Sequence, residues 1–240
     1  MSALPDRTAR VDIPPPTFMN PSINVIRAAR APRWSRKRLI GMLIDCYGAS
    51  PSNGVDFSAV GHYVGVSPAT VRRWVGGRPA PGRRMVIPKA RLTQLQCAPA
   101  EVERRNQQRY EHALAALASI NDEKSILPAW RERRWLDQHM VVVIAIRGRP
   151  WLQVAITNGS KRALAELLRR GAMISAIEVP TQFHAQVLMQ AVMVRQQAWR
   201  VHPALERLSV GRTQVWMDDA PPVDLTELAN ALGIERVSTR

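Results

Sequence analysis

Long apolar runs and cysteines are both scarce in this chain of 240 residues. No segment approaches the roughly 20 apolar residues of a membrane-spanning helix, and the N-terminus lacks the apolar region of a signal peptide. The two cysteines, Cys46 and Cys97, lie in apolar stretches that we expect to be helical. Such low cysteine use is typical of proteins that stay reduced. We therefore expect a cytoplasmic protein with no membrane partner.

The residue patterns of common enzyme sites are also missing. The five histidines have no metal-ligand spacing, and there is no glycine-rich phosphate loop. Neither of the dipeptides at which self-cleaving repressors cut, Ala-Gly and Cys-Gly, occurs. Tyrosine recombinases need a C-terminal tyrosine nucleophile, whereas all three tyrosines lie in the first half of the chain. We expect no catalysis, no metal and no cofactor.

Acidic residues are rare in one segment, which leaves a concentrated positive charge there. The whole chain has 34 lysines and arginines against 19 acids, a net charge of +15. Between Arg27 and Arg91 there are 13 basic residues and only two acids, so this segment carries +11 and the rest of the chain +4. So localised a charge indicates a segment that binds a polyanion. A membrane surface fits less well as the polyanion, because the segment has no long one-sided basic amphipathic helix.

Arginine supplies nearly all of this charge, since only four of the basic residues are lysines. The forked donor of arginine suits phosphates and guanine edges better than the lysine ammonium does. A genome rich in G and C would also favour arginine codons. Codon bias does not explain the net excess of positive charge.

Proline content and composition divide the chain into three parts. Residues 1–32 are expected to form a flexible, basic and proline-rich arm, with four prolines in the twelve residues VDIPPPTFMNPS. Residues 33–121 are expected to be all-helical. Residues 122–240 are expected to form a smaller domain of mixed α and β structure with a β-hairpin and long helices. The expected fold class is therefore α+β.

Capping residues and apolar periodicity place the individual elements. Within residues 33–121, helices are expected from near Trp34 to Gly48 and over residues 57–64, 67–75, 88–96 and 99–120. Within residues 122–240, helices are expected over residues 128–138, 161–170, 181–200 and 224–233, and strands over residues 140–146, 151–157, 173–179 and 213–217.

The segment VGVSPATVRRW, residues 64–74, has the spacing of two helices that cross at a tight turn. Gly65 supplies the left-handed turn residue, and the small Gly61 lies four residues earlier, where the two helices approach closely. Ser67 is a suitable N-cap and Pro68 a suitable first helical residue. The residues expected to pack the two helices together are Val60, Gly61, Val64, Gly65, Val71 and Trp74.

The second helix of this pair would turn six residues outward, and a short outward face of this kind can enter the major groove of DNA. Arginine bonds guanine O6 and N7 together, and a threonine methyl or alanine contacts the thymine methyl. The residues expected to contact bases are Ser67, Pro68, Ala69, Thr70, Arg72 and Arg73. The alternative interpretation is a structural helical hairpin with two solvated arginines.

The pattern FSAVGHYVGVSPATVRRW, with a helix on each side, resembles the helix-turn-helix of the Cro/repressor-like group, in particular the immunity repressors of temperate phages that infect actinobacteria. The resemblance covers roughly residues 34–96. Gly61 departs from the alanine usual in this group, and we expect it to loosen the first helix without spoiling the crossing. The resemblance implies a transcriptional repressor that binds operator sites in double-stranded DNA, occludes a promoter and maintains lysogeny. It also implies a location at the nucleoid in the host cytoplasm.

Further basic residues are expected to contact the DNA backbone, which positions a protein without specifying sequence. One group lies beside the arm, where a solvated helix face is an equally good interpretation. The other group lies in the loop GGRPAPGRRMVIPK. The residues are Arg27, Arg30, Arg33, Arg36, Lys37, Arg38, Arg78, Arg83, Arg84 and Lys89.

The sequence leaves the role of residues 122–240 open. The apolar segment QVLMQAVMVRQQAW is expected to be a core helix, with a homodimer interface as the alternative. A second DNA-contacting surface is a third interpretation, and it would use Arg131, Arg133, Arg134, Arg147 and Arg149.

Two other functions remain open. The first is a DNA-architectural or partition-type protein. The second is a DNA-processing enzyme, for which the acids available are Glu166, Glu178, Asp218 and Asp219.

Overall fold

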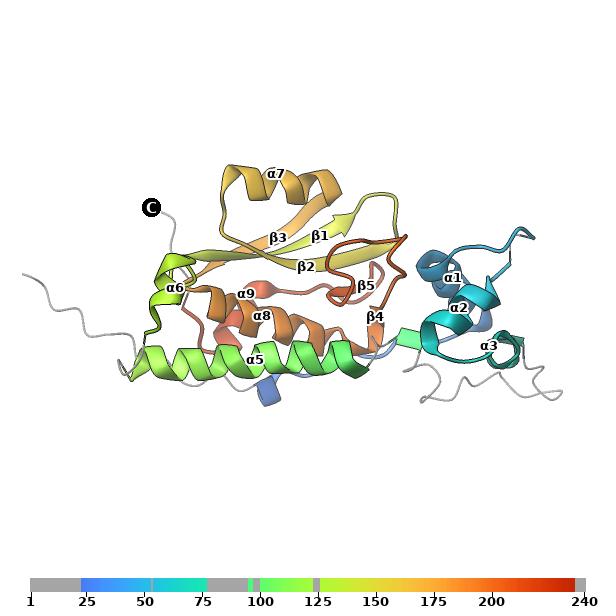
Figure 1. The fold of residues 1–240 in the computed structure, drawn as a ribbon, viewed down its shortest axis with the longest axis horizontal. Helices are drawn as coiled ribbons and strands as arrows, with labels where there is room; N and C mark the ends of the chain where they lie inside the picture. Colours follow the sequence, from blue (N-terminus) through green and yellow to red (C-terminus); the bar gives the residue numbers. More distant parts are fainter. Residues whose placement is uncertain (1–22, 53, 77–94, 97–99, 123–125, 236–240) are drawn as a thin grey trace, which may run out of the picture.

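The computed structural model describes residues 23–52, 54–76, 95–96, 100–122 and 126–235. Over these ranges the fold is mixed α+β, with eight α-helices and one five-stranded antiparallel sheet, so the expected fold class is confirmed. Figure 1 shows the first three helices gathered at one end of the long axis, beyond the edge of the sheet that carries β4 and β5.

The first helices are α1 (Arg36–Tyr47), α2 (Phe57–Val64) and α3 (Pro68–Gly76), preceded by a short 3-10 helix η1 (Ile23–Val25). Both ends of α1 are capped: the Ser35 side chain accepts from the Arg38 amide at 3.2 Å, and Gly48 ends the helix. The buried face of α1 consists of Leu39, Met42, Leu43, Cys46 and Tyr47.

The sheet contains β1 (His139–Ile146), β2 (Trp151–Thr157), β3 (Gly171–Val179), β4 (Arg200–Val201) and β5 (Val215–Met217). The strand order is β3-β1-β2-β5-β4, and every neighbouring pair is antiparallel. The predicted hairpin of β1 and β2 is confirmed, with Val143 opposite Val154. Residues 141–144 of β1 are all buried, as expected for a central strand that is covered on both faces.

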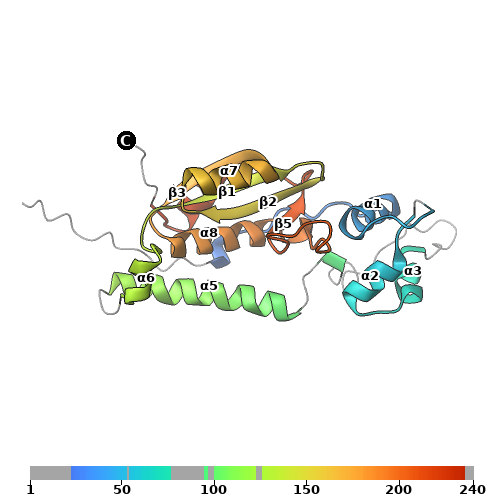
Figure 2. The same cartoon turned by 45° about the horizontal axis from the view of Figure 1, so that its top comes forward.

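Helices cover both faces of the sheet. Figures 1 and 2 show α7 (Lys161–Arg170) on one face and α8 (Gln182–Arg195) on the other, with α5 (Ala100–Asn121) packed outside α8. The smaller helices α6 (Pro128–Glu132) and α9 (Leu225–Ala231) flank this layer. Because every residue of α8 is buried or half-buried, its interpretation as a core helix is confirmed.

Two predicted helices are shorter than expected. The helix predicted over residues 128–138 ends at Glu132, because Arg134 takes a left-handed conformation with φ 56° and the chain turns there. The turn places Trp135 against the Phe183 ring at 6.0 Å. The helix predicted over residues 181–200 ends at Arg195, and a 3-10 turn η2 (Gln197–Trp199) leads into β4, a strand that the sequence did not predict. Of the helix predicted over residues 88–96, only residues 95 and 96 are described.

Residues 23–35, which we call the N-terminal strap, lie against the end of α8. The Ala29 amide donates to the Arg195 carbonyl at 2.6 Å, and Arg195 Nη1 donates to the Arg27 carbonyl at 2.9 Å. The Trp199 indole donates to the Arg30 carbonyl at 2.9 Å. The described part of the predicted arm is therefore held by the last turn of α8 and the residues that follow it.

Across the ranges that the structure covers, no helix combines the length and the apolar character needed to cross a membrane.

Candidate nucleic-acid interface

The corner between α2 and α3 is built by three local signals. The Asp56 carboxylate accepts from the Ser58 and Ala59 amides at 3.0 and 2.9 Å, which starts α2. Gly65 ends α2 in the left-handed conformation, with φ 71° and ψ 33°. The Ser67 hydroxyl accepts from the Thr70 amide at 3.2 Å at the start of α3. The predicted boundaries of both helices are confirmed to within one residue.

The two helices cross at Gly61, which is buried. A Cβ atom on Gly61 would lie 2.6 Å from the Val66 carbonyl oxygen and 3.2 Å from the Pro68 nitrogen, both of which are backbone atoms. This backbone therefore has no room for an alanine at position 61, and with glycine there the crossing is intact, as expected. Val60 and Val71 are completely buried beside the crossing, while Val64 and Trp74 are half-buried against the same core.

The outer face of α3 presents the residues that the sequence predicted as base contacts. Ser67, Pro68, Ala69, Arg72 and Arg73 are exposed, and Thr70 is half-buried. The guanidinium of Arg72 lies 5.5 Å from the centre of the Phe57 ring, which steadies its position.

One hydrogen bond on this face limits its chemistry. The Thr70 hydroxyl is 2.9 Å from the Ser67 hydroxyl, so one of these groups is already engaged as a donor to the other. The two arginines are therefore the strongest donors that the outer face of α3 presents to a ligand.

The described basic residues near the strap divide into two groups. Arg27, Arg30, Arg33, Arg36 and Lys37 are exposed. Arg38 is instead bonded to Asp219 at 2.7 Å, and its guanidinium lies 5.0 Å from the Trp199 ring. Arg38 therefore links α1 to residues 122–240 of the chain. The other predicted backbone contacts, Arg78, Arg83, Arg84 and Lys89, lie outside the described residues.

A polar cluster that the sequence did not predict joins α2 to the loop between β4 and β5. The Tyr63 hydroxyl accepts from Arg212 Nη2 at 2.8 Å and contacts Nδ1 of His202. Burial, and then the positive charges of Arg212 and Arg200, lower the pKa of His202 to about 4, so this histidine is neutral at pH 7. Burial raises the pKa of Tyr63 above its ordinary value. No periodicity marks these residues, because they are single positions brought together by the tertiary fold.

The arginines considered for a second DNA-contacting surface do not form one patch. Arg131, Arg133 and Arg134 lie in or just after α6, which precedes β1, whereas Arg147 and Arg149 follow β1 at the hairpin turn. The two groups are therefore at opposite ends of one strand.

The acids considered for a DNA-processing site are similarly dispersed. Within the described ranges, no group of three or more histidine, cysteine, aspartate or glutamate side chains is placed to hold a metal. Glu166 is on α7, Glu178 is on β3, and Asp219 is paired with Arg38.

The molecule thus presents a compact, exposed and arginine-bearing corner, which is fixed by a tight helix crossing and tied to the rest of the chain through Tyr63 and Arg38. Comparisons of the sequence with protein-family models and curated proteins, and of the structure with solved structures, found no match.

Proposed function

We propose that the protein is a sequence-specific DNA-binding transcriptional repressor, in which α2 and α3 form a helix-turn-helix and α3 docks in the major groove. The observation that carries this proposal is the corner at Gly65, where a crossing too tight for alanine leaves the N-terminal face of α3 exposed with Arg72 and Arg73. This is the part of a recognition helix that contacts base edges.

The charge of the surroundings supports the same proposal. The segment from Arg27 to Arg91 carries +11, and its exposed arginines near α1 are suited to phosphate oxygens. Phosphate contacts place α3 on the duplex, and Arg72 and Arg73 then distinguish bases, each well-formed bidentate pair contributing about 1–3 kcal/mol of discrimination. Bound over a promoter, the protein excludes the polymerase sterically, as the resemblance to phage immunity repressors implies.

The test is selection of binding sites from random duplex DNA with three proteins. These are the wild type, the double variant Arg72→Ala/Arg73→Ala, and the control double variant Lys161→Ala/Arg162→Ala. The control removes the same charge from exposed positions of α7, away from α3. We expect one consensus sequence for the wild type and the control. The Arg72→Ala/Arg73→Ala variant should lose the consensus and keep weak, salt-sensitive binding.

Two results would count against the proposal. Recovery of the same consensus by all three proteins would show that α3 does not read bases. Recovery of no consensus by any of them would mean non-specific binding, as expected of an architectural protein.

A further inference from the structure

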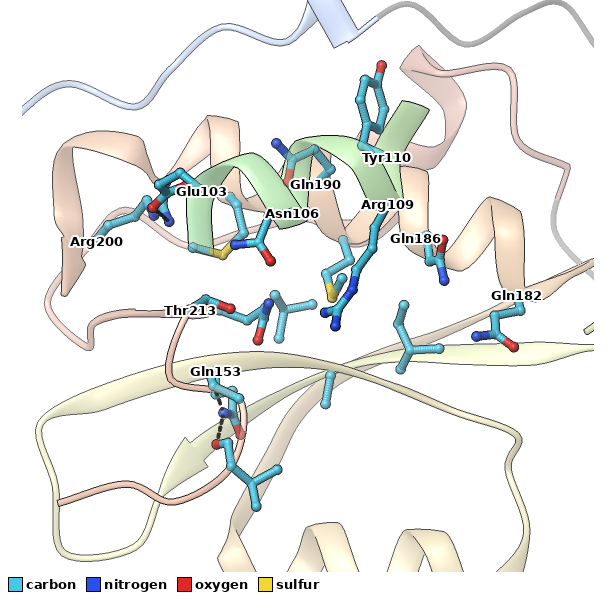
Figure 3. Close-up of a pocket in the computed structure, with 18 of the residues that line it drawn as sticks. Glu103, Asn106, Arg109, Tyr110, Gln153, Gln182, Gln186, Gln190, Arg200 and Thr213 are labelled. Atoms are coloured by element: carbon cyan, nitrogen blue, oxygen red, sulfur yellow. Dashed lines mark hydrogen bonds and ion pairs between the residues drawn. The ribbon is translucent and has the colours of Figure 1, made fainter. Parts of the chain in front are cut away.

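A cavity of about 460 Å³ lies between α5, α8 and the β2 side of the sheet, far along the chain from α3. Its size falls within the range of about 300–1,000 Å³ typical of small-molecule sites. Figure 3 shows Asn106 and Arg109 reaching into it from α5, Gln182 and Gln186 from α8, and Thr213 from the loop before β5. Methionine and valine side chains complete its apolar part.

The charge of the lining is positive and only partly balanced. Three arginines line the cavity, and Glu103 is the only acid among its described lining residues. Glu103 is paired with Arg200 at 2.7 Å, which neutralises one of the three. The other two, Arg109 and Arg170, have no carboxylate bonded to them within the described part of the chain.

Arg170 is held in place by a neutral amide and forms no salt bridge within the described residues. It is half-buried, and Nη2 donates to the carboxamide oxygen of the fully buried Gln153. Gln153 is itself fixed, since its Nε2 donates to the Val210 and Gly211 carbonyls at 2.8 and 2.9 Å. A guanidinium stays charged in proteins, and burial lowers the pKa of Arg170 while the nearby carboxylate of Glu166 offsets part of this effect.

Among the described residues, two buried polar atoms of the lining also have no hydrogen-bond partner: Nε of Arg170 and Oε1 of Gln186. Buried polar atoms are nearly always hydrogen-bonded in folded proteins, and an exception is expected where a ligand supplies the missing partner. An anionic group would satisfy the first atom, and a hydroxyl or amide donor would satisfy the second.

We infer that this cavity binds a small organic anion, no larger than a mononucleotide, whose negative group is held by the guanidinium groups of Arg109 and Arg170. Its body lies over the apolar part of the lining and hydrogen-bonds to the carboxamides on α5 and α8. The site is separate from the α3 surface, so the inference stands or falls independently of DNA binding.

Calorimetric titration of the full chain with inorganic phosphate, citrate and AMP tests the inference, with uncharged adenosine as the comparison ligand. We expect at least one of the anions to bind at millimolar concentration or below, and adenosine to bind more weakly than AMP. The Arg109→Gln variant should raise the Kd of the binding anion about ten- to a hundredfold, as expected for loss of a charge-assisted hydrogen bond. Arg109 is exposed, so this change should not affect folding.

Two controls separate this site from the other basic surfaces. Arg104→Gln removes an exposed arginine from the same helix that does not line the cavity, and it should leave the Kd unchanged. The Arg72→Ala/Arg73→Ala variant should also bind the anion as the wild type does. An NMR spectrum of the arginine Nε–H groups should show the Arg170 resonance moving on titration in both controls.

The inference is overturned if none of the three anions binds at 10 mM, a concentration on the order of that expected for the weakest specific sites. It is also overturned if Arg109→Gln and Arg104→Gln have equal effects, or if the response disappears in the Arg72→Ala/Arg73→Ala variant. The last result would mean that the anion binds on α3 instead.

Discussion

At the scale of single residues, the geometry of the α2–α3 corner depends on the missing side chain of Gly61. An added methyl group would meet the Val66 carbonyl and the Pro68 nitrogen, which belong to the turn and cannot rotate away as a side chain can. The methyl group must therefore push the two helices apart or distort the turn. Gly41 provides the opposite case, since a Cβ atom there would meet nothing within 4 Å in the middle of α1.

We predict that Gly61→Ala lowers the free energy of unfolding by about 1–3 kcal/mol, the usual cost of overpacking. Gly41→Ala should raise it by about 0.5–1 kcal/mol, because alanine is favoured over glycine inside a helix. Urea denaturation of the two variants and the wild type measures both effects. Equal effects of the two substitutions would contradict the close crossing at Gly61.

At the scale of elements, α2 is joined to the β4–β5 loop by a contact that requires a neutral histidine. The Tyr63 hydroxyl accepts from Arg212 and lies against Nδ1 of His202, and this nitrogen can accept the hydroxyl proton only when it is unprotonated. The Ala204 amide donates to the Cys46 carbonyl at 2.9 Å beside this cluster and adds a second link to α1. Acid that protonates His202 will therefore weaken the joint.

The pH dependence of stability follows from the lowered pKa of His202. Its folded-state pKa of about 4 lies below the ordinary value of 6.5, so the unfolded chain binds a proton that the folded chain does not bind between these values. Stability is full above pH 6.5 and falls as the pH drops toward 4. We predict that protonation of His202 lowers the free energy of unfolding by about 2 kcal/mol between pH 7 and pH 5.

Urea denaturation at both pH values, on the wild type and on His202→Gln, measures this contribution. His202→Gln should be less stable at pH 7 but should lose about 2 kcal/mol less on going to pH 5. His62→Gln, which changes an exposed histidine on α2, is the matched control for the loss of one histidine. An unchanged pH dependence in His202→Gln would rule out this role of His202.

The elements that the sequence predicted well are those with local signals. Caps at Ser35, Asp56 and Thr181 and the left-handed Gly65 fix helix ends through their nearest neighbours. The two helices predicted too long end for tertiary reasons. One is Trp135 packing on Phe183, and the other is the pairing of β4 with β5. The sequence could not predict the cluster of Tyr63, His202 and Arg212, nor the cavity between α5, α8 and β2, because the residues of each come from segments that are distant in the sequence.

At the scale of the whole molecule, most of the positive charge lies on one part of the chain. The strap carries three exposed arginines, Arg27, Arg30 and Arg33, and leads along the chain into α1. The contacts of the strap with Arg195 and Trp199 use its backbone carbonyl and amide groups, so these three arginine side chains remain available for phosphates.

We predict that DNA affinity falls steeply with salt, and that Arg27→Ala/Arg30→Ala/Arg33→Ala reduces the slope of log K against log salt by roughly 2–3, at about 0.9 for each phosphate that is no longer neutralised. Fluorescence anisotropy with the selected duplex at several salt concentrations measures the slope. The control Lys161→Ala/Arg162→Ala/Arg169→Ala removes the same charge from α7 and should keep the wild-type slope. Equal slopes for all three proteins would mean that the strap does not contact DNA.

The strap also sets an order of events during synthesis on the ribosome. The strap is made before α1, but it is held by Arg195 and Trp199, which emerge after most of the chain. At a synthesis rate of about 5–20 residues per second, the interval between synthesis of the strap and synthesis of Trp199 is on the order of ten seconds. The helices that follow the strap can form their local contacts in that interval, while the strap stays open to proteases. A nascent chain stalled before Arg195 should therefore be cleaved within the strap, and one that has passed Trp199 should resist cleavage there.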